Sequence, residues 1–178
     1  MIVLPGFLIA ILTFPGIIVH EAAHRFFCDI ARVPVYEVCY FRINGPQGYV
    51  IHGPTDRLGA HFLISIGPLI VNSLLCAVLC FVPLVAFKLD VSQTPAVFIF
   101  LLWLGVSIGM HAFPSTQDVQ SFSAAVKRGS GRSPLLLIAK LFQIVVVVAN
   151  ALRVIWFDLI YAVALAHVPL LLLAGTVQ

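Results

Sequence analysis

The chain of 178 residues is 61% hydrophobic and only 10% charged, and its mean hydropathy is +1.10. In soluble globular domains roughly a quarter of the residues are charged. The composition of this chain therefore excludes an ordinary soluble domain and predicts a multi-pass protein of the lipid bilayer. The formal net charge of +3 comes from scattered residues and gives no indication of a nucleic-acid partner.

The first apolar segment, about 2–27, is long enough for a membrane-spanning helix, because a span needs about 20 apolar residues. No basic region precedes it, so we interpret it as a retained helix and not as a cleaved signal peptide. The dipeptide Pro15-Gly16 predicts a kink. Just after this kink lies the sequence HEAAH, at 20–24.

Two histidines four residues apart face the same side of a helix, so His20 and His24 can bind one Zn²⁺. Glu21 is then placed to act as a general base on water that the metal activates. In soluble proteins such a match is often just two surface histidines. Here it lies among aliphatic residues, where buried Glu and His are rarely kept without a role, and we predict a membrane-embedded zinc site.

The segment 33–55 has a different composition. Residues 35–43 are rich in β-branched and aromatic side chains, 44–48 supply turn residues, and 49–52 resume the strand pattern. We expect a short re-entrant or interfacial β-hairpin, whose edge can pair with an extended peptide. A plain interfacial loop is the alternative, since Pro and Gly are frequent in the segment.

Four further apolar segments bring the prediction to about five transmembrane helices in an all-α polytopic fold: 58–87, 95–113, 135–152 and 156–175. The last two are separated at Arg153, Trp156 and Asp158, charged and aromatic residues that are typical of a membrane surface.

No internal repeat or long linker divides the chain, so we expect a single membrane-embedded domain over 1–178. Within it, the sequence places a catalytic core at about 2–120 and additional helices at about 134–175.

The four cysteines do not suggest a disulfide framework in such a chain. Cys76 and Cys80 lie within an apolar helix and are expected to be small buried side chains. Cys28 lies one turn beyond His24, where a zinc-binding thiolate is conceivable but a plain helix-end residue is favoured.

Basic residues predict the orientation. Most of them flank or occupy the connections after the first and third spans: Arg25, Arg32, Arg42, Arg57, Lys127, Arg128 and Arg132. The positive-inside rule puts both connections in the cytoplasm. We therefore expect a protein of the cell membrane whose hairpin and HExxH motif lie toward the cytoplasmic side.

Catalytic zinc usually has three protein ligands and an open position, so one more side chain must join the histidines. The polar candidates on the same side are Glu37, His52, Asp56, His61, His111 and Asp118. Asp118 stands out because Pro114 ends the third span and returns a carboxylate near membrane depth. A solvated capping or turn aspartate is the alternative.

Three motifs in this order resemble the site-2 protease family of intramembrane zinc metalloproteases. HEAAH at 20–24 lies on an apolar helix, GPLIVN at 67–72 resembles the family's Gly-Pro-x-x-Asn motif, and HAFPSTQD at 111–118 resembles its Asn-x-x-Pro…Asp-Gly motif. The expected hairpin resembles the family's re-entrant β-element. Together these features cover about residues 10–120.

The resemblance implies an endopeptidase that cleaves membrane-embedded or membrane-adjacent proteins and peptides. It also implies Asp118 as third zinc ligand and a role for Asn72 in binding substrate or the oxyanion. For Asn72, helix packing through an interhelical hydrogen bond is the alternative. The chain departs from the family pattern at His111, where Asn is usual, and at Val119, where Gly is usual.

Two other functions fit parts of the sequence. A noncatalytic zinc-stabilised membrane scaffold or chaperone would keep the fold and bind partners, but it would not need Glu21. A metal transporter would need further ligands along a path through several helices, and the apolar later spans offer few.

Overall fold

The computed structural model describes residues 6–43, 45–88, 95–129 and 133–175. It is 77% helical, with seven α-helices and one small two-stranded sheet in the described chain, in agreement with the predicted fold class. Two stretches, Leu58–Pro83 and Pro134–Ile155, are long and apolar enough to cross a membrane. The bent pair of helices that covers residues 6–30 is a third candidate. The apolar helices Pro95–Met110 and Phe157–Val168 are shorter than a span needs. The structure therefore supports two to three membrane spans and does not confirm the predicted five.

The first predicted span consists of two helices, α1 (Gly6–Leu12) and α2 (Phe14–Ile30), which meet at an angle of 81°. The break lies at Thr13, slightly ahead of the predicted kink. Pro15 occupies the first turn of α2, where its missing N–H removes no helix hydrogen bond. The Thr13 hydroxyl donates to the carbonyl of Ile9 at 2.7 Å and closes α1.

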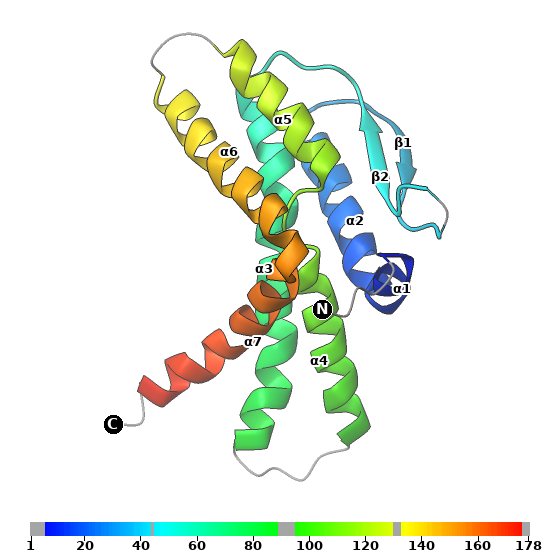
Figure 1. Cartoon of the computed structure of the whole chain (residues 1–178), viewed down its shortest axis with the longest axis vertical. Coiled ribbons are helices and arrows are strands. Elements are labelled where there is room, and N and C mark those ends of the chain that lie inside the picture. The colour runs from blue at the N-terminus through cyan, green and yellow to red at the C-terminus, as the bar shows by residue number, and fades with distance from the viewer. Residues whose placement is uncertain (1–5, 44, 89–94, 130–132, 176–178) are drawn as a thin grey trace.

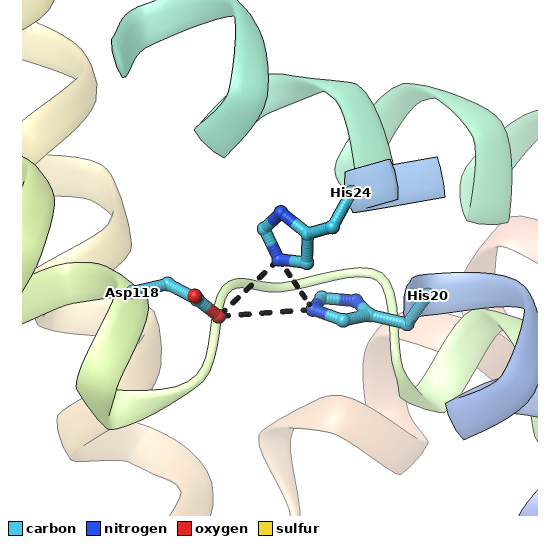
Figure 2. Close-up of side chains that lie close together, drawn as sticks. All are labelled: His20, His24 and Asp118. Carbon is cyan, nitrogen blue, oxygen red and sulfur yellow. Dashed lines mark hydrogen bonds and ion pairs between the residues drawn. The ribbon is translucent and has the colours of Figure 1, made fainter. Parts of the chain in front are cut away.

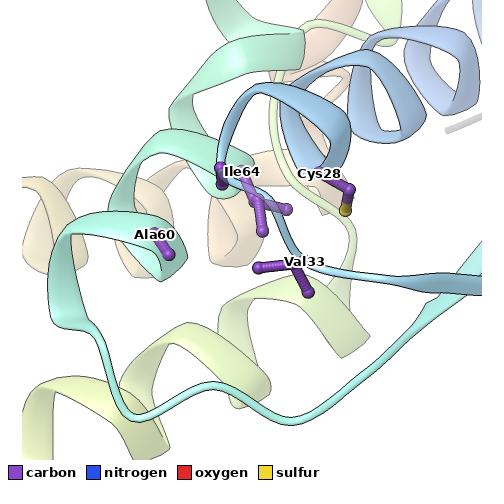
Figure 3. Packing of buried hydrophobic residues seen from close by; sticks show 5 residues of the cluster. Cys28, Val33, Ala60 and Ile64 are labelled. Carbon is purple, nitrogen blue, oxygen red and sulfur yellow. The ribbon is translucent and has the colours of Figure 1, made fainter.

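The C-terminal end of α2 is a Schellman motif with Arg32 in the left-handed region, at φ 53°. The backbone N–H of Val33 donates to the carbonyl of Cys28 at 2.9 Å. Val33 and Cys28 thereby join Ala60 and Ile64 in a buried apolar cluster (Figure 3). The Cys28 side chain is fully buried there.

The expected hairpin is present: β1 (Val35–Cys39) pairs antiparallel with β2 (Tyr49–His52). It lies beside α2 (Figure 1). The first strand ends at Cys39 and not at Ile43, and in the loop that follows the Arg42 side chain donates to the carbonyl of Pro46 at 2.8 Å.

The long helix α3 (Leu58–Lys88) runs through the molecule (Figure 1). Its C-terminal half packs against α4 (Pro95–Met110) and α7 (Phe157–Gly175). Cys76 and Cys80 are fully buried in this contact, as predicted. Glycines on α4 permit the close approach: a Cβ on Gly109 would lie 2.7 Å from the sulfur of Cys76.

The N-terminal half of α3 packs against α5 (Thr116–Arg128) and α6 (Pro134–Leu152). Three aromatic rings, one from each helix, form the centre of this contact: Phe62, Phe122 and Phe142. A 3₁₀ turn, η1 (Arg153–Ile155), then separates α6 from α7, where the sequence predicted the division.

Candidate metal centre

His20 and His24 project from the buried face of α2 toward Asp118 of α5 (Figure 2). The two Nε2 atoms lie 3.1 Å apart. The Asp118 Oδ2 atom is 3.4 Å from Nε2 of His24 and 3.8 Å from Nε2 of His20. The fold therefore brings a carboxylate from a distant part of the sequence onto the HExxH pair.

These residues fit a zinc ion by spacing and by chemistry. A tetrahedral zinc with ligand atoms at 2.0–2.1 Å separates those atoms by roughly 3.3 Å. The three observed separations, 3.1, 3.4 and 3.8 Å, lie close to that value. Two imidazoles and one carboxylate are a donor set that catalytic zinc uses, with a fourth position for water or substrate.

The ring of His20 is oriented by the backbone. Its Nδ1 donates to the carbonyl oxygen of His111 at 2.6 Å, which leaves the lone pair on Nε2 facing the metal position. The His111 side chain is engaged elsewhere: its Nε2 donates to the Thr13 hydroxyl at 2.8 Å, at the corner between α1 and α2.

Asp118 combines two roles that the sequence presented as alternatives. It is the third residue of a capping box, in which its own N–H donates to the Ser115 hydroxyl at 3.2 Å and the Ser115 N–H donates to Oδ2 at 2.8 Å. The same oxygen faces both histidines. Burial raises the pKa of the Asp118 carboxyl, but the imidazoles of His24 and His20 outweigh burial and hold that pKa well below its usual range.

Glu21 is buried and lines two cavities beside the histidines. The smaller, of about 100 Å³, also contains His24 and Asp118 in its wall, and the larger, of about 430 Å³, contains His20. Gly48 of the hairpin loop lines both cavities and lies against Glu21: a Cβ on Gly48 would be 2.8 Å from Oε1. The Glu21 carboxylate thus lies between the candidate metal ligands, the two cavities and the hairpin loop.

Asn72 lies outside both cavity walls and is fully buried. Its Nδ2 donates to the carbonyls of His111 at 3.0 Å, Ile108 at 3.1 Å and Gly16 at 3.4 Å. In this arrangement the amide joins α3 to α2 and to the end of α4, as in the packing interpretation. Asn72 also shares the acceptor of His20, the carbonyl of His111.

The other candidate ligands are not brought to the centre. Within the described part of the chain, only His20, His24 and Asp118 form a group of three or more metal-binding side chains. Glu37 accepts a hydrogen bond from the hydroxyl of Tyr49 on the hairpin. The two remaining histidines line the smaller cavity, but each donates a ring N–H to a loop carbonyl: His52 to Gly53 and His61 to Thr55.

Two contributors to the site were not foreseen. Ser115 was detectable, because Ser-x-x-Asp ahead of an amphipathic helix is a capping-box pattern. The carbonyl of His111 left no signal in the sequence, since any residue supplies a backbone carbonyl.

Comparison of the chain with protein-family models, with curated proteins and with solved structures finds no match. A functional assignment therefore depends on the geometry described above and on the order of the motifs.

Proposed function

We propose that the chain is a membrane zinc endopeptidase of the site-2 protease type, which hydrolyses peptide bonds of membrane-embedded or membrane-adjacent substrates. The observation that carries the proposal is the convergence of His20, His24 and Asp118, whose ligand atoms all lie within 4.8 Å of one another. Glu21 beside these ligands supplies the base that hydrolysis requires.

His20, His24 and Asp118 would hold the metal through Nε2, Nε2 and Oδ2. Zinc bound there supplies Lewis acidity, which activates water and polarises the peptide carbonyl. Glu21 accepts the proton of the attacking water on a carboxylate oxygen and delivers it to the departing amine nitrogen as the C–N bond breaks. The ionised Asp118 carboxylate offsets part of the metal charge and leaves a positive centre.

The hairpin offers a way to hold the substrate. A membrane helix buries its amides in its own hydrogen bonds, so it must unwind before a bond can be cut. In the described chain the sheet has two strands, so β1 and β2 each have an edge outside the pairing. An extended substrate segment paired with one of these edges regains backbone hydrogen bonds next to Glu21.

The basic residues support a cytoplasmic position for this end of the protein. They lie in the C-terminal half of α2, just before α3 and in the last turn of α5, as with Arg25, Arg57 and Lys127. These helix ends lie together, opposite the C-terminal end of α3 (Figure 1). By the positive-inside rule we place this end in the cytoplasm of a multi-pass cell-membrane protein.

The decisive experiment compares wild type with Glu21→Gln, purified in detergent and reconstituted in vesicles with a library of transmembrane peptides. Zinc content is measured by elemental analysis and cleavage by mass spectrometry. We expect Glu21→Gln to keep its zinc and to lose at least about 100-fold in cleavage, because the amide cannot accept the proton.

The matched control is Asp29→Asn, an exposed acidic residue on the same helix, which should cleave like wild type. Equal cleavage by wild type and Glu21→Gln would refute the mechanism. A wild type that binds zinc but cuts nothing in the library would favour the noncatalytic scaffold.

A further inference from the structure

Arg153, at the elbow between α6 and α7, contacts the short segment that leads into the capping box of Asp118. One guanidinium nitrogen, Nη2, donates to the carbonyl of Phe113 at 3.1 Å and to that of Pro114 at 3.2 Å. The Nε atom forms an ion pair with Asp158 at 2.9 Å. Both charged residues also line the larger cavity together with His20.

The carbonyls that Arg153 binds lie between the end of α4 and the capping box of α5. A backbone carbonyl at such a junction has no helical partner and needs another donor when it is buried. Phe113 and Pro114 are buried, so Arg153 supplies that donor to both. The next residue, Ser115, holds the Asp118 carboxylate through its N–H.

Other contacts from the elbow bind the same short segment. The side chain of Asn150 donates to the carbonyl of Pro114 at 3.5 Å and accepts from the hydroxyl of Thr116 at 3.3 Å. The ring of Phe113 packs edge-on against Tyr161, with centroids 4.8 Å apart. Residues 113–116 are thus held from several directions by the C-terminal helices.

The backbone of the elbow is itself in an unfavourable conformation. Trp156 has φ 62°, in the left-handed region that a bulky side chain rarely adopts. This residue turns the chain between Arg153 and Asp158, so that the two side chains can pair. Such a conformation persists where the surrounding contacts require it, and it is common near functional sites.

We propose that Arg153 is a positioning residue of the metal centre: it fixes the 113–115 segment and, through Ser115, the ligand Asp118. This inference rests on the metal site of the proposed function. The C-terminal helices then contribute to the metal site, and a core limited to about 2–120 would lack the contacts that fix the position of Asp118.

The test is a thermodynamic cycle on the full-length protein in detergent, with zinc affinity measured by competition with a chelator. Arg153→Gln should weaken zinc binding about 10- to 100-fold, the usual effect of losing a residue that orients a ligand. Arg153→Lys keeps a positive charge with N–H donors, although in another geometry, and should recover part of this loss. Lys140→Gln, which removes an exposed cation from α6, should leave the affinity unchanged.

The same substitution is then made in the Asp118→Ala background. If Arg153 acts through Asp118, Arg153→Gln should reduce the remaining affinity by less than about twofold, because coupled residues are not additive. The visible absorption of bound Co²⁺ gives a second readout: Arg153→Gln should weaken the strong band of a tetrahedral site, as Asp118→Ala does.

Wild-type zinc affinity in folded Arg153→Gln, or an equal loss with and without Asp118, would overturn the inference. Zinc affinity and the Co²⁺ spectrum do not require peptide cleavage. A failure of the protease proposal in the Glu21→Gln experiment would therefore be distinguishable from a failure of this one.

Discussion

Replacing Asn72 by Ala separates the two roles that the sequence allowed for this residue. The side chain is fully buried, and its amide nitrogen donates to three carbonyls, at 3.0, 3.1 and 3.4 Å. An amide nitrogen has two hydrogens, so the three acceptors share about two good hydrogen bonds. Alanine would leave these carbonyls without that donor in a dry environment.

The expected magnitude follows from those bonds. A buried polar group left unpaired costs about 1–3 kcal/mol, so two give about 2–6 kcal/mol. All three carbonyls keep another partner, since those of Ile108 and Gly16 lie within helices and that of His111 accepts from His20, which favours the lower half, about 2–4 kcal/mol. For a chain of 150–250 residues this corresponds to a fall in melting temperature of roughly 4–16 °C.

Zinc affinity should fall as well, because the carbonyl of His111 also orients the ring of His20. We expect at least about a 10-fold loss. The measurements are thermal unfolding in detergent and chelator competition, and Gln120→Ala, an exposed amide on α5, is the matched control. The opposite outcome would be an unchanged melting temperature and zinc affinity with a 10²–10³-fold loss of turnover, which is the signature of an oxyanion donor. That outcome would refute the packing role.

Two further substitutions test how the site is enclosed and held. Gly48→Ala should reduce cleavage while zinc stays bound, because the new Cβ would lie 2.7 Å from Cγ of Glu21 and must displace the hairpin loop or the carboxylate. The control is Gly59→Ala, whose Cβ would meet nothing closer than 3.6 Å. Equal cleavage by both variants would contradict the close contact at Gly48. Ser115→Ala should destabilise the protein by about 1 kcal/mol through loss of the helix cap. It should also weaken zinc binding, since Asp118 loses a hydrogen bond. If unfolding and chelator assays show destabilisation with wild-type zinc affinity, Ser115 only caps α5.

Local patterns predicted much of this protein. The spacing of His20 and His24 required only helical periodicity, and a hairpin at 33–55 followed from strand and turn residues around a loop. The boundary at Arg153 also followed from composition. These features depend on neighbours in the sequence, so the sequence alone carries their signal.

Features that depend on distant contacts were predicted less well. The 81° corner at Thr13 was expected as a kink in one span, since a proline near a helix start and one inside a helix look alike in sequence. The setting of Asp118 and the family resemblance favour it as the third ligand, but its approach to His24 depends on how α5 packs against α3 and α6. The contribution of Arg153 was not foreseen, because its partners are backbone carbonyls of residues 113 and 114.

The shared carbonyl of His111 connects the three motifs that were recognised separately. It accepts from His20 of the first motif and from Asn72 of the second, and it belongs to the first residue of the third. Because the acceptor is the backbone oxygen of His111, the His111 side chain can make a separate contact. Here it binds Thr13 at the α1–α2 corner. The presence of His where the family pattern has Asn therefore leaves the orientation of His20 intact. The geometry of the candidate metal centre therefore does not depend on which side chain residue 111 carries.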